Sequence, residues 1–87
     1  MYFLYILRCA DDTLYTGITT DLARRVGEHN FSPLGAKYTR ARRPVELVFS
    51  KKFRSRSAAS CAEYKMKQLT REQKMSLIQK TALRLKH

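Results

Sequence analysis

The sequence predicts a small α/β domain of the α+β type, with a three-stranded antiparallel sheet flanked by helices. Two aromatic and aliphatic runs, residues 2–9 and 14–18, are separated by the turn-rich spacer 10–13, which is typical of a hairpin. A third apolar run follows at residues 45–49, and the segments between and after the runs carry apolar residues at helical spacing. With 87 residues the chain can bury one core, so we expect a single domain over residues 1–87.

The first two strands are followed by a helix and a basic loop. Thr20 or Asp21 can cap a helix that runs to about His29, with an apolar stripe at i,i+4 spacing. The stretch 30–44 is then irregular, because it carries two prolines and a glycine among several basic residues. A loop of this length is usually functional.

The second half of the chain predicts a strand and two helices. Val45, Leu47 and Phe49 alternate and should share one face of the third strand. The helix over residues 57–69 should point the following residues inward: Ala58, Ala62, Met66 and Leu69. Thr70 and Gln73 form a capping box before a basic C-terminal helix over about 71–86. The inward residues of that helix should be Met75, Leu77, Ile78, Ala82 and Leu85.

The charge of the chain predicts its partner. Eighteen Lys and Arg against seven Asp and Glu give a net charge of +11, a density that repels itself unless a polyanion relieves it. Nucleic acid is the commonest such partner, whereas a membrane partner would need an exposed amphipathic face or a lipidation signal. The apolar run at residues 2–7 is too short to span a bilayer. We therefore expect a cytoplasmic protein that binds nucleic acid and no membrane.

The two cysteines do not indicate a metal centre. Cys9 and Cys61 are far apart and belong to no CxxC pair or His-Cys cluster, which a zinc site would need. We expect both to be buried free thiols.

Arg25 and His29 lie on one side of the first helix, because they are four residues apart. Asp21 precedes Arg25 by four residues, so a surface ion pair followed by a solvated histidine also accounts for the pattern. Glu63 borders the apolar stripe of its helix, and a lone inward carboxylate suits a hard cation. An i,i+4 pair with Lys67, contributing ~0.3 kcal/mol, is the alternative interpretation of Glu63.

Tyr5 and Tyr15 fall on the two strands of the predicted hairpin. Such tyrosines most often pack at a sheet edge, and Gly17 can relieve crowding near a bend. A two-residue turn would put the two tyrosines on opposite faces, whereas a three-residue or bulged loop puts them together. A shared catalytic role requires the second geometry.

These residues together resemble a known signature. Tyr5-Ile6, then Tyr15-Thr16-Gly17, then Asp21-Leu22, Arg25 and His29, with Glu63 further on, are similar in order and spacing to the GIY-YIG endonuclease superfamily. The resemblance spans about residues 2–69. Within it, the stretch 35–46 resembles the small stand-alone bacterial branch.

The sequence departs from the superfamily pattern at three places. Phe3-Leu4 stands before Tyr5 where many members have a glycine and an aliphatic residue, and Thr16 replaces an aliphatic one. Ile18-Thr19 offers no lysine near the second tyrosine. The residue types expected for catalysis are all retained.

The resemblance implies a phosphodiester hydrolase with one divalent ion, Mg²⁺ or Mn²⁺, held by Glu63 with waters and the scissile phosphate. It further implies that Tyr15 orients or deprotonates the attacking water and that Arg25 stabilises charge on the phosphoryl oxygens. Tyr5 would position the nucleophile or phosphate, and His29 would transfer or orient a proton.

The basic residues should bind the backbone of the substrate, DNA rather than RNA, with weak or structure-based specificity. The predicted nucleic-acid-binding residues are Lys37, Tyr38, Arg40, Arg42, Arg43, Lys51, Lys52 and Arg54. One alternative is a non-catalytic nucleic-acid-binding module of the same fold, and another is a structural protein of a ribonucleoprotein particle.

Overall fold

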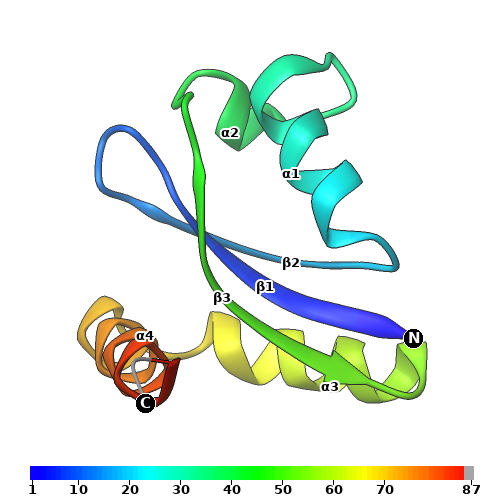
Figure 1. Ribbon diagram of the computed structural model, residues 1–87, viewed down its shortest axis with the longest axis vertical. Coiled ribbons are helices and arrows are strands. Elements are labelled where there is room, and N and C mark those ends of the chain that lie inside the picture. Colours follow the sequence, from blue (N-terminus) through cyan, green and yellow to red (C-terminus); the bar gives the residue numbers. More distant parts are fainter. Residues whose placement is uncertain (86–87) are drawn as a thin grey trace.

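A three-stranded antiparallel sheet in the order β2-β1-β3 forms the centre of the computed structural model, as the sequence predicted (Figure 1). The strands are β1 (Tyr2–Arg8), β2 (Leu14–Thr19) and β3 (Glu46–Phe53). The structure describes residues 1–85, with side chains through residue 80. Because β1 pairs with both neighbours, its side chains alternate between two fully covered faces.

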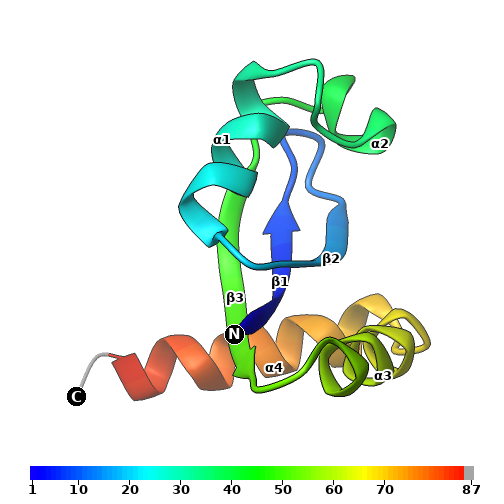
Figure 2. The same cartoon turned by 90° about the vertical axis from the view of Figure 1, so that its right-hand side faces the viewer.

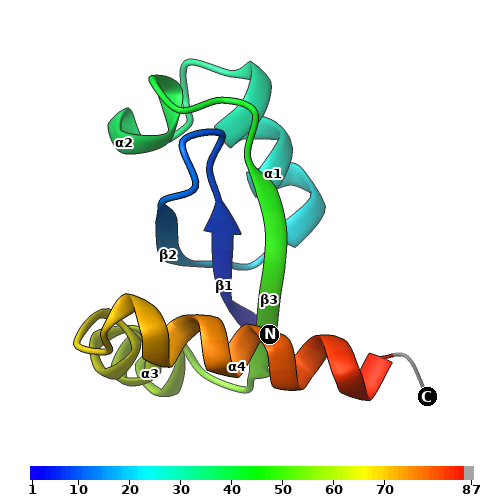
Figure 3. The same cartoon turned by 90° about the vertical axis from the view of Figure 1, so that its left-hand side faces the viewer.

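Helices cover the two faces of the sheet as separate layers. In Figure 1 one pair lies above the strands and the other below, and the turned views of Figures 2 and 3 show α4 running across beneath them. The helices are α1 (Leu22–Phe31), α2 (Lys37–Arg40), α3 (Arg56–Lys67) and α4 (Arg71–Leu85). The prediction of an entirely irregular stretch at 30–44 is therefore wrong at α2.

Each layer encloses its own core. The cluster toward α3 and α4 consists of Leu4, Ile6, Phe49 and Met66. The cluster toward α1 consists of Tyr5, Leu7, Cys9 and Val45. The second cluster is the less apolar of the two, because a tyrosine hydroxyl is buried within it. The α1 face of the sheet is therefore the more polar of its two covered faces.

The hairpin loop gives the two motif tyrosines a common face. Cys9 and Thr13 are joined by a backbone hydrogen bond of 2.8 Å from the amide of Cys9, and Asp12 has a φ of 67°, the left-handed residue of a three-residue loop. Tyr15 then pairs with Leu7, which shares a face with Tyr5. The geometry that a shared role requires is confirmed.

A bulge in β3 makes one sequence prediction wrong. Leu47 pairs with Leu7 and Phe49 pairs with Ile6, so the strand has one extra residue between these pairs. Leu47 and Phe49 consequently face opposite sides, and Val45 and Phe49 belong to different core clusters. A bulge leaves no alternation signal that the sequence alone would reveal.

The predicted inward face of helix α3 is confirmed at Ala62, Met66 and Leu69 and is wrong at its first position. Ala59 is fully buried while Ala58 is exposed, so the inward series begins at Ala59 and continues through Ala62 and Met66. Cys61 falls on the outer face and is exposed, which corrects the expectation that both thiols are buried. The apolar stripe follows i,i+3,i+7 spacing rather than i,i+4.

The predicted helix caps are confirmed. The Asp21 carboxylate accepts the Arg24 amide at 3.1 Å and begins α1, which extends past the expected end to Phe31. Thr70 and Gln73 form the reciprocal capping box of α4, at 2.9 and 3.2 Å.

Helix α4 is the longest in the described chain, and its residues Leu77 and Ile78 pack against the core. The inward positions predicted at Ala82 and Leu85 fall outside the described side chains, and residue 86 falls outside the described residues. None of the helices within residues 1–85 has the length and apolar character needed to cross a membrane.

Gly17 provides a test of this packing. A Cβ at Gly17 would lie 2.6 Å from the Tyr5 hydroxyl, whereas a Cβ at Gly27 would meet nothing within 4 Å. Gly17→Ala should lower the free energy of unfolding by roughly 1–3 kcal/mol, since the Tyr5 ring must move. Gly27→Ala, inside α1, should raise it by about 0.5–1 kcal/mol. Urea unfolding measures both, and equal effects would contradict the close approach at Gly17.

Candidate active site

Three motif side chains from three elements meet on the α1 face of the sheet. The ring of Tyr15 lies 6.4 Å from that of Tyr5 and 5.1 Å from that of His29, measured between centroids. Tyr5 is 1% exposed and His29 is 0% exposed, whereas Tyr15 is only half-buried. Tyr15 is therefore the member of this group that a substrate can reach directly.

A chain of buried hydrogen bonds runs away from Tyr5. The Tyr5 hydroxyl lies 2.9 Å from His29 Nε2, and Nδ1 of the same ring lies 2.8 Å from the hydroxyl of Thr39. Thr39 donates its proton to the Ala36 carbonyl at 2.9 Å, so its oxygen is free to accept from Nδ1. We assign the tautomer from these directions: Nδ1 carries the proton and Nε2 accepts from Tyr5. The Ala36 amide, 3.4 Å from Nδ1, is a longer and weaker competitor.

Burial determines the protonation states of the His29 ring and the Tyr5 hydroxyl. Burial lowers the pKa of His29 to about 4, with further lowering from the charges of Arg25 and Arg43, so the ring is neutral near pH 7. Burial likewise raises the pKa of Tyr5 to about 12, against a hydrogen bond from Arg25 that lowers it. Tyr5 therefore stays a phenol and acts as a hydrogen-bond donor. The surface alternative for His29, a solvated histidine, is wrong.

Arg25 is directed at Tyr5 by its other contacts. Its Nη1 donates to Glu28 Oε1 at 2.9 Å and to the Leu34 carbonyl at 2.8 Å, and its interaction with Tyr5 lowers the pKa of that phenol. The ion pair with Asp21, considered as the alternative, is not formed, because Asp21 caps the helix. The guanidinium is thus held in place from two sides beside the tyrosines.

Glu63 lies on α3, in the layer on the opposite face of the sheet. Its side chain is 24% exposed, and Lys67 Nζ lies 3.6 Å from its Oε2, so the predicted i,i+4 pair is formed. Its charge also contributes, after burial and Tyr15, to raising the pKa of Tyr5, which puts the carboxylate within electrostatic reach of that ring. The two interpretations of Glu63 are therefore compatible.

The donor set at Glu63 fits a hard divalent ion. A carboxylate oxygen is the ligand that Mg²⁺ prefers, and this ion usually keeps several waters and takes one or two protein carboxylates. Within residues 1–85 no group of three or more His, Cys, Asp or Glu side chains gathers at one place. If Glu63 bound such an ion, water and a substrate phosphate would have to complete the shell.

The predicted nucleic-acid-binding residues separate into groups in the structure. Lys37, Tyr38 and Arg40 lie on α2, next to the site, where the Tyr38 ring is 6.0 Å from that of Tyr15. Arg42 covers the Tyr38 ring at 4.0 Å and also donates to Asp11 at 3.0 Å.

The remaining members lie elsewhere. Arg43 donates to the carbonyls of Glu28, His29 and Ser32, so this side chain holds the loop together rather than projecting into solvent. Lys51 and Lys52 lie on β3, the sheet edge away from β2, and Arg54 follows that strand.

Thr39 is the site residue that sequence reasoning did not find. It is fully buried, although it stands in a stretch expected to be an exposed basic loop. Only its place on a short helix, folded back over His29, makes it a partner of the ring. Nothing in the spacing of the sequence signals this contact.

Residues 1–76 match the GIY-YIG catalytic domain, so fold and site together define a member of the GIY-YIG nuclease superfamily. The chain is 57% identical over 77 residues to a UPF0213 protein of Desulfotalea psychrophila, covering 88% of this chain and 70% of that protein. It is 46% identical over 84 residues to a UPF0213 protein of Pediococcus pentosaceus, covering 97% and 87%. The chain belongs to the UPF0213 family of small stand-alone GIY-YIG proteins.

Two solved structures support this membership. A solution structure of a UPF0213 protein from Bacillus halodurans is 45% identical, with a TM-score of 0.58 over 91% of this chain and 84% of that one. A solution structure of a protein from E. faecalis is 44% identical, with a TM-score of 0.63 over 94% and 86%. The resemblance found in the sequence is confirmed, and membership implies nucleic acid as the partner.

The buried His29 predicts a pH dependence of stability. Its pKa is about 4 in the folded chain against an ordinary 6.5, so between these values the unfolded chain binds more protons. The stabilisation is complete above pH 6.5 and is lost as the pH falls toward 4, by up to about 3 kcal/mol. Urea unfolding across this range measures it, with His29→Gln as the reference. The same slope in both proteins would contradict a buried neutral ring.

Thr39 predicts a separate loss. Thr39→Val keeps the shape but leaves the His29 Nδ1–H without its acceptor, so the free energy of unfolding should fall by about 1–3 kcal/mol. Thr20→Val, at an exposed position, is the matched control and should stay within about 0.5 kcal/mol. Thermal or urea unfolding compares the two, and a Thr39 variant as stable as the control would remove Thr39 from the chain of bonds.

Proposed function

We propose that this protein is a divalent-metal-dependent endonuclease that hydrolyses phosphodiester bonds in DNA with weak or structure-based specificity. The observation that carries the proposal is the convergence of Tyr5, Tyr15, Arg25 and His29 at one place on the sheet. A fold by itself does not define an activity, but the family model that matches residues 1–76 describes a catalytic domain, which supports the proposal.

The two tyrosines have different parts in this proposal. Tyr15 is half-buried and lines an open pocket, so its hydroxyl can orient the attacking water, and its phenolate form can accept the proton of that water. Tyr5 is buried and keeps its own proton, which makes it a fixed donor that positions the phosphate or the nucleophile. His29 touches no solvent and acts through Tyr5, by holding the phenol in one orientation.

Arg25 supplies positive charge where negative charge develops. A guanidinium that is already oriented does not need to reorganise when charge builds on the phosphoryl oxygens. The bonds to Glu28 and the Leu34 carbonyl provide that orientation. Its charge lowers the pKa of Tyr5, but burial outweighs this effect and leaves the phenol protonated.

Glu63 would hold the Mg²⁺ or Mn²⁺ ion, and the bound ion would supply charge neutralisation at the phosphate. The contribution of the chain is to keep this carboxylate ready. Lys67 Nζ lies 3.6 Å from Oε2. This long contact orients the carboxylate and still leaves it able to bind an ion.

The low sequence specificity follows from the kind of contacts available. The exposed basic side chains next to the site, Lys37 and Arg40 on α2, suit phosphate oxygens, which carry no sequence information. Helix α2, which carries these side chains, has only four residues and is too short to fill a DNA groove. Binding should therefore depend on salt and on the shape of the DNA.

Cleavage assays test the activity. Labelled duplex, single-stranded and branched DNA are incubated with Mg²⁺ or Mn²⁺, and cutting should stop when EDTA is added. Tyr15→Phe removes one hydroxyl and should lower the cleavage rate by about 10²–10⁴-fold. Tyr64→Phe, at an exposed position on α3, should leave the rate unchanged.

Glu63→Ala tests the ligand, with Glu72→Ala on α4 as the control, and only the first should abolish metal-dependent cutting. Binding of all these substrates without cutting by the intact protein would establish the alternative, a nucleic-acid-binding module of the same fold.

A further inference from the structure

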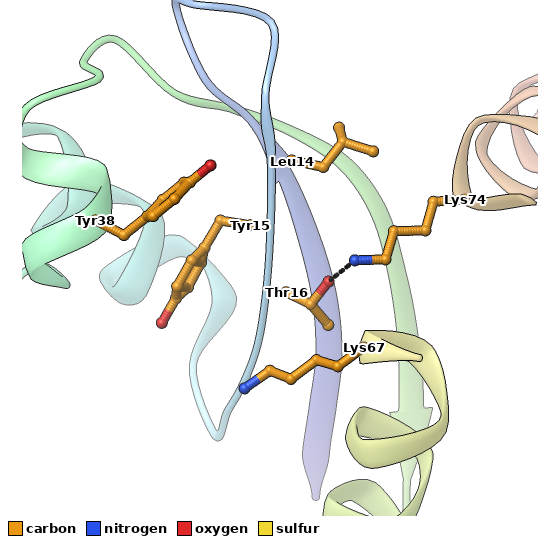
Figure 4. Close-up of a pocket in the computed structure, with 6 residues that line it drawn as sticks. All are labelled: Leu14, Tyr15, Thr16, Tyr38, Lys67 and Lys74. Carbon is orange, nitrogen blue, oxygen red and sulfur yellow. Dashed lines mark hydrogen bonds between the residues drawn. The ribbon is translucent and has the colours of Figure 1, made fainter. Parts of the chain in front are cut away.

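A pocket of about 270 Å³ lies at the free edge of β2, beside the candidate active site (Figure 4). We call it the edge pocket, and its lining residues are Leu14, Tyr15, Thr16, Tyr38, Lys67 and Lys74. Figure 4 shows the two tyrosines on one side of β2 and the two lysines reaching toward the strand from the helices on the other. Neither lysine belongs to the predicted nucleic-acid-binding set.

Contacts between residues far apart in the sequence position the helix that carries Lys74. Arg71, at the start of α4, donates to the carboxylate of Asp12 at 2.9 Å and to its carbonyl, which fastens the helix to the hairpin loop. Lys74 follows one turn later and reaches Thr16 Oγ1 at 3.5 Å. The pocket is thus built by long-range contacts, not by the chance meeting of two surface side chains.

The two ammonium groups have little negative charge to balance them. Among the described residues no carboxylate pairs with Lys74, and Lys67 has only the 3.6 Å contact with Glu63. Asp11, Asp12 and Glu46 are engaged by arginines elsewhere. Burial, and then the charge of Lys67, lowers the pKa of Lys74. The two ammonium groups therefore repel each other, and an anion bound between them would relieve the repulsion.

The position of the pocket indicates which anion. Tyr15 and Thr16 are consecutive on an edge strand, so their side chains lie on opposite faces, one residue apart. A nucleic-acid strand whose reacting phosphate lies at Tyr15 must continue past this edge. Its next phosphate would then meet the lysines on the Thr16 side.

We propose that the edge pocket binds the backbone phosphate adjacent to the scissile one, through Lys67 from α3 and Lys74 from α4. This inference rests on the proposed function, since it assumes a strand at Tyr15. It accounts for the missing lysine at Ile18-Thr19: the positive charge beside the second tyrosine is supplied from the helices instead of from β2. Helix α4 thereby becomes part of the substrate site.

Salt-dependent binding tests the proposal. Lys67→Gln/Lys74→Gln is compared with Lys65→Gln/Lys80→Gln, which removes two exposed lysines from the same two helices. Affinity for a labelled oligonucleotide is measured in EDTA, where nothing is cut. The edge variant should reduce the slope of log K against log salt by about 2, one for each phosphate-binding lysine, with a loss of about tenfold or more near 0.1 M salt. The control should keep the slope of the intact protein.

A methylphosphonate scan locates the phosphate. Oligonucleotides that each carry one uncharged linkage are bound to the intact protein and to the edge variant. Neutralising the linkage next to the cleaved one should weaken binding to the intact protein and have no effect on the variant, as expected for two partners of one contact. Lys67→Arg/Lys74→Arg, which keeps both charges, should restore the position-dependent loss.

The outcomes separate the two ideas. An edge variant that behaves like its control, in an intact protein that binds and cuts, would overturn the pocket and leave the nuclease. A slope reduced in the edge variant alone, without any cutting by the intact protein, would support phosphate binding at the pocket and overturn the nuclease. Failure of the intact protein to bind any of the oligonucleotides would overturn both.

Discussion

The burial of the Tyr5 hydroxyl is the constraint on which the rest of this structure depends. A phenol placed in the core between the sheet and α1 needs a hydrogen-bond partner, because a buried hydroxyl without one would cost roughly 1–3 kcal/mol. His29 provides that partner, and its own second nitrogen then needs Thr39. One buried polar atom thus determines where α1 must lie and why the next segment must fold back as α2.

The two faces of β1 contribute to two different parts of the structure. Leu4 and Ile6 of β1 make the apolar core with α3 and α4, while Tyr5 and Leu7 face the site. Stability is concentrated in the first layer, which leaves the second free to bury a tyrosine and a histidine. The two layers meet at the edge of β2. There, side chains of α3 and α4 line the same pocket as Tyr15 and Tyr38.

Much of this arrangement could be predicted from the sequence, and the failures have physical causes. The apolar runs and their spacer indicated the first two strands, and the cap and apolar stripe indicated the first helix, because those features depend on local spacing. The common face of Tyr5 and Tyr15 was a requirement of the resemblance, which the three-residue loop meets. Three other features depend on partners far away in the chain: the bulge opposite Leu7, the inward position of Ala59 and the burial of Thr39. The contacts of Arg42 and Arg43 could not be predicted for the same reason. A basic residue in a loop gives the same sequence pattern whether its side chain faces solvent, a carboxylate or a backbone carbonyl. The parts taken by Tyr15, Arg25 and Glu63 in chemistry are still predictions.

The hairpin loop between β1 and β2 limits how this chain can vary. The left-handed residue Asp12 completes a loop of odd length, and that odd number is what turns Tyr15 toward Tyr5. Substitutions in the loop leave the count intact, but the gain or loss of a single residue would transfer every side chain of β2 to the other face. Insertions and deletions should therefore be tolerated here only in pairs, and a homologue with an even loop would have to place its second tyrosine one position away.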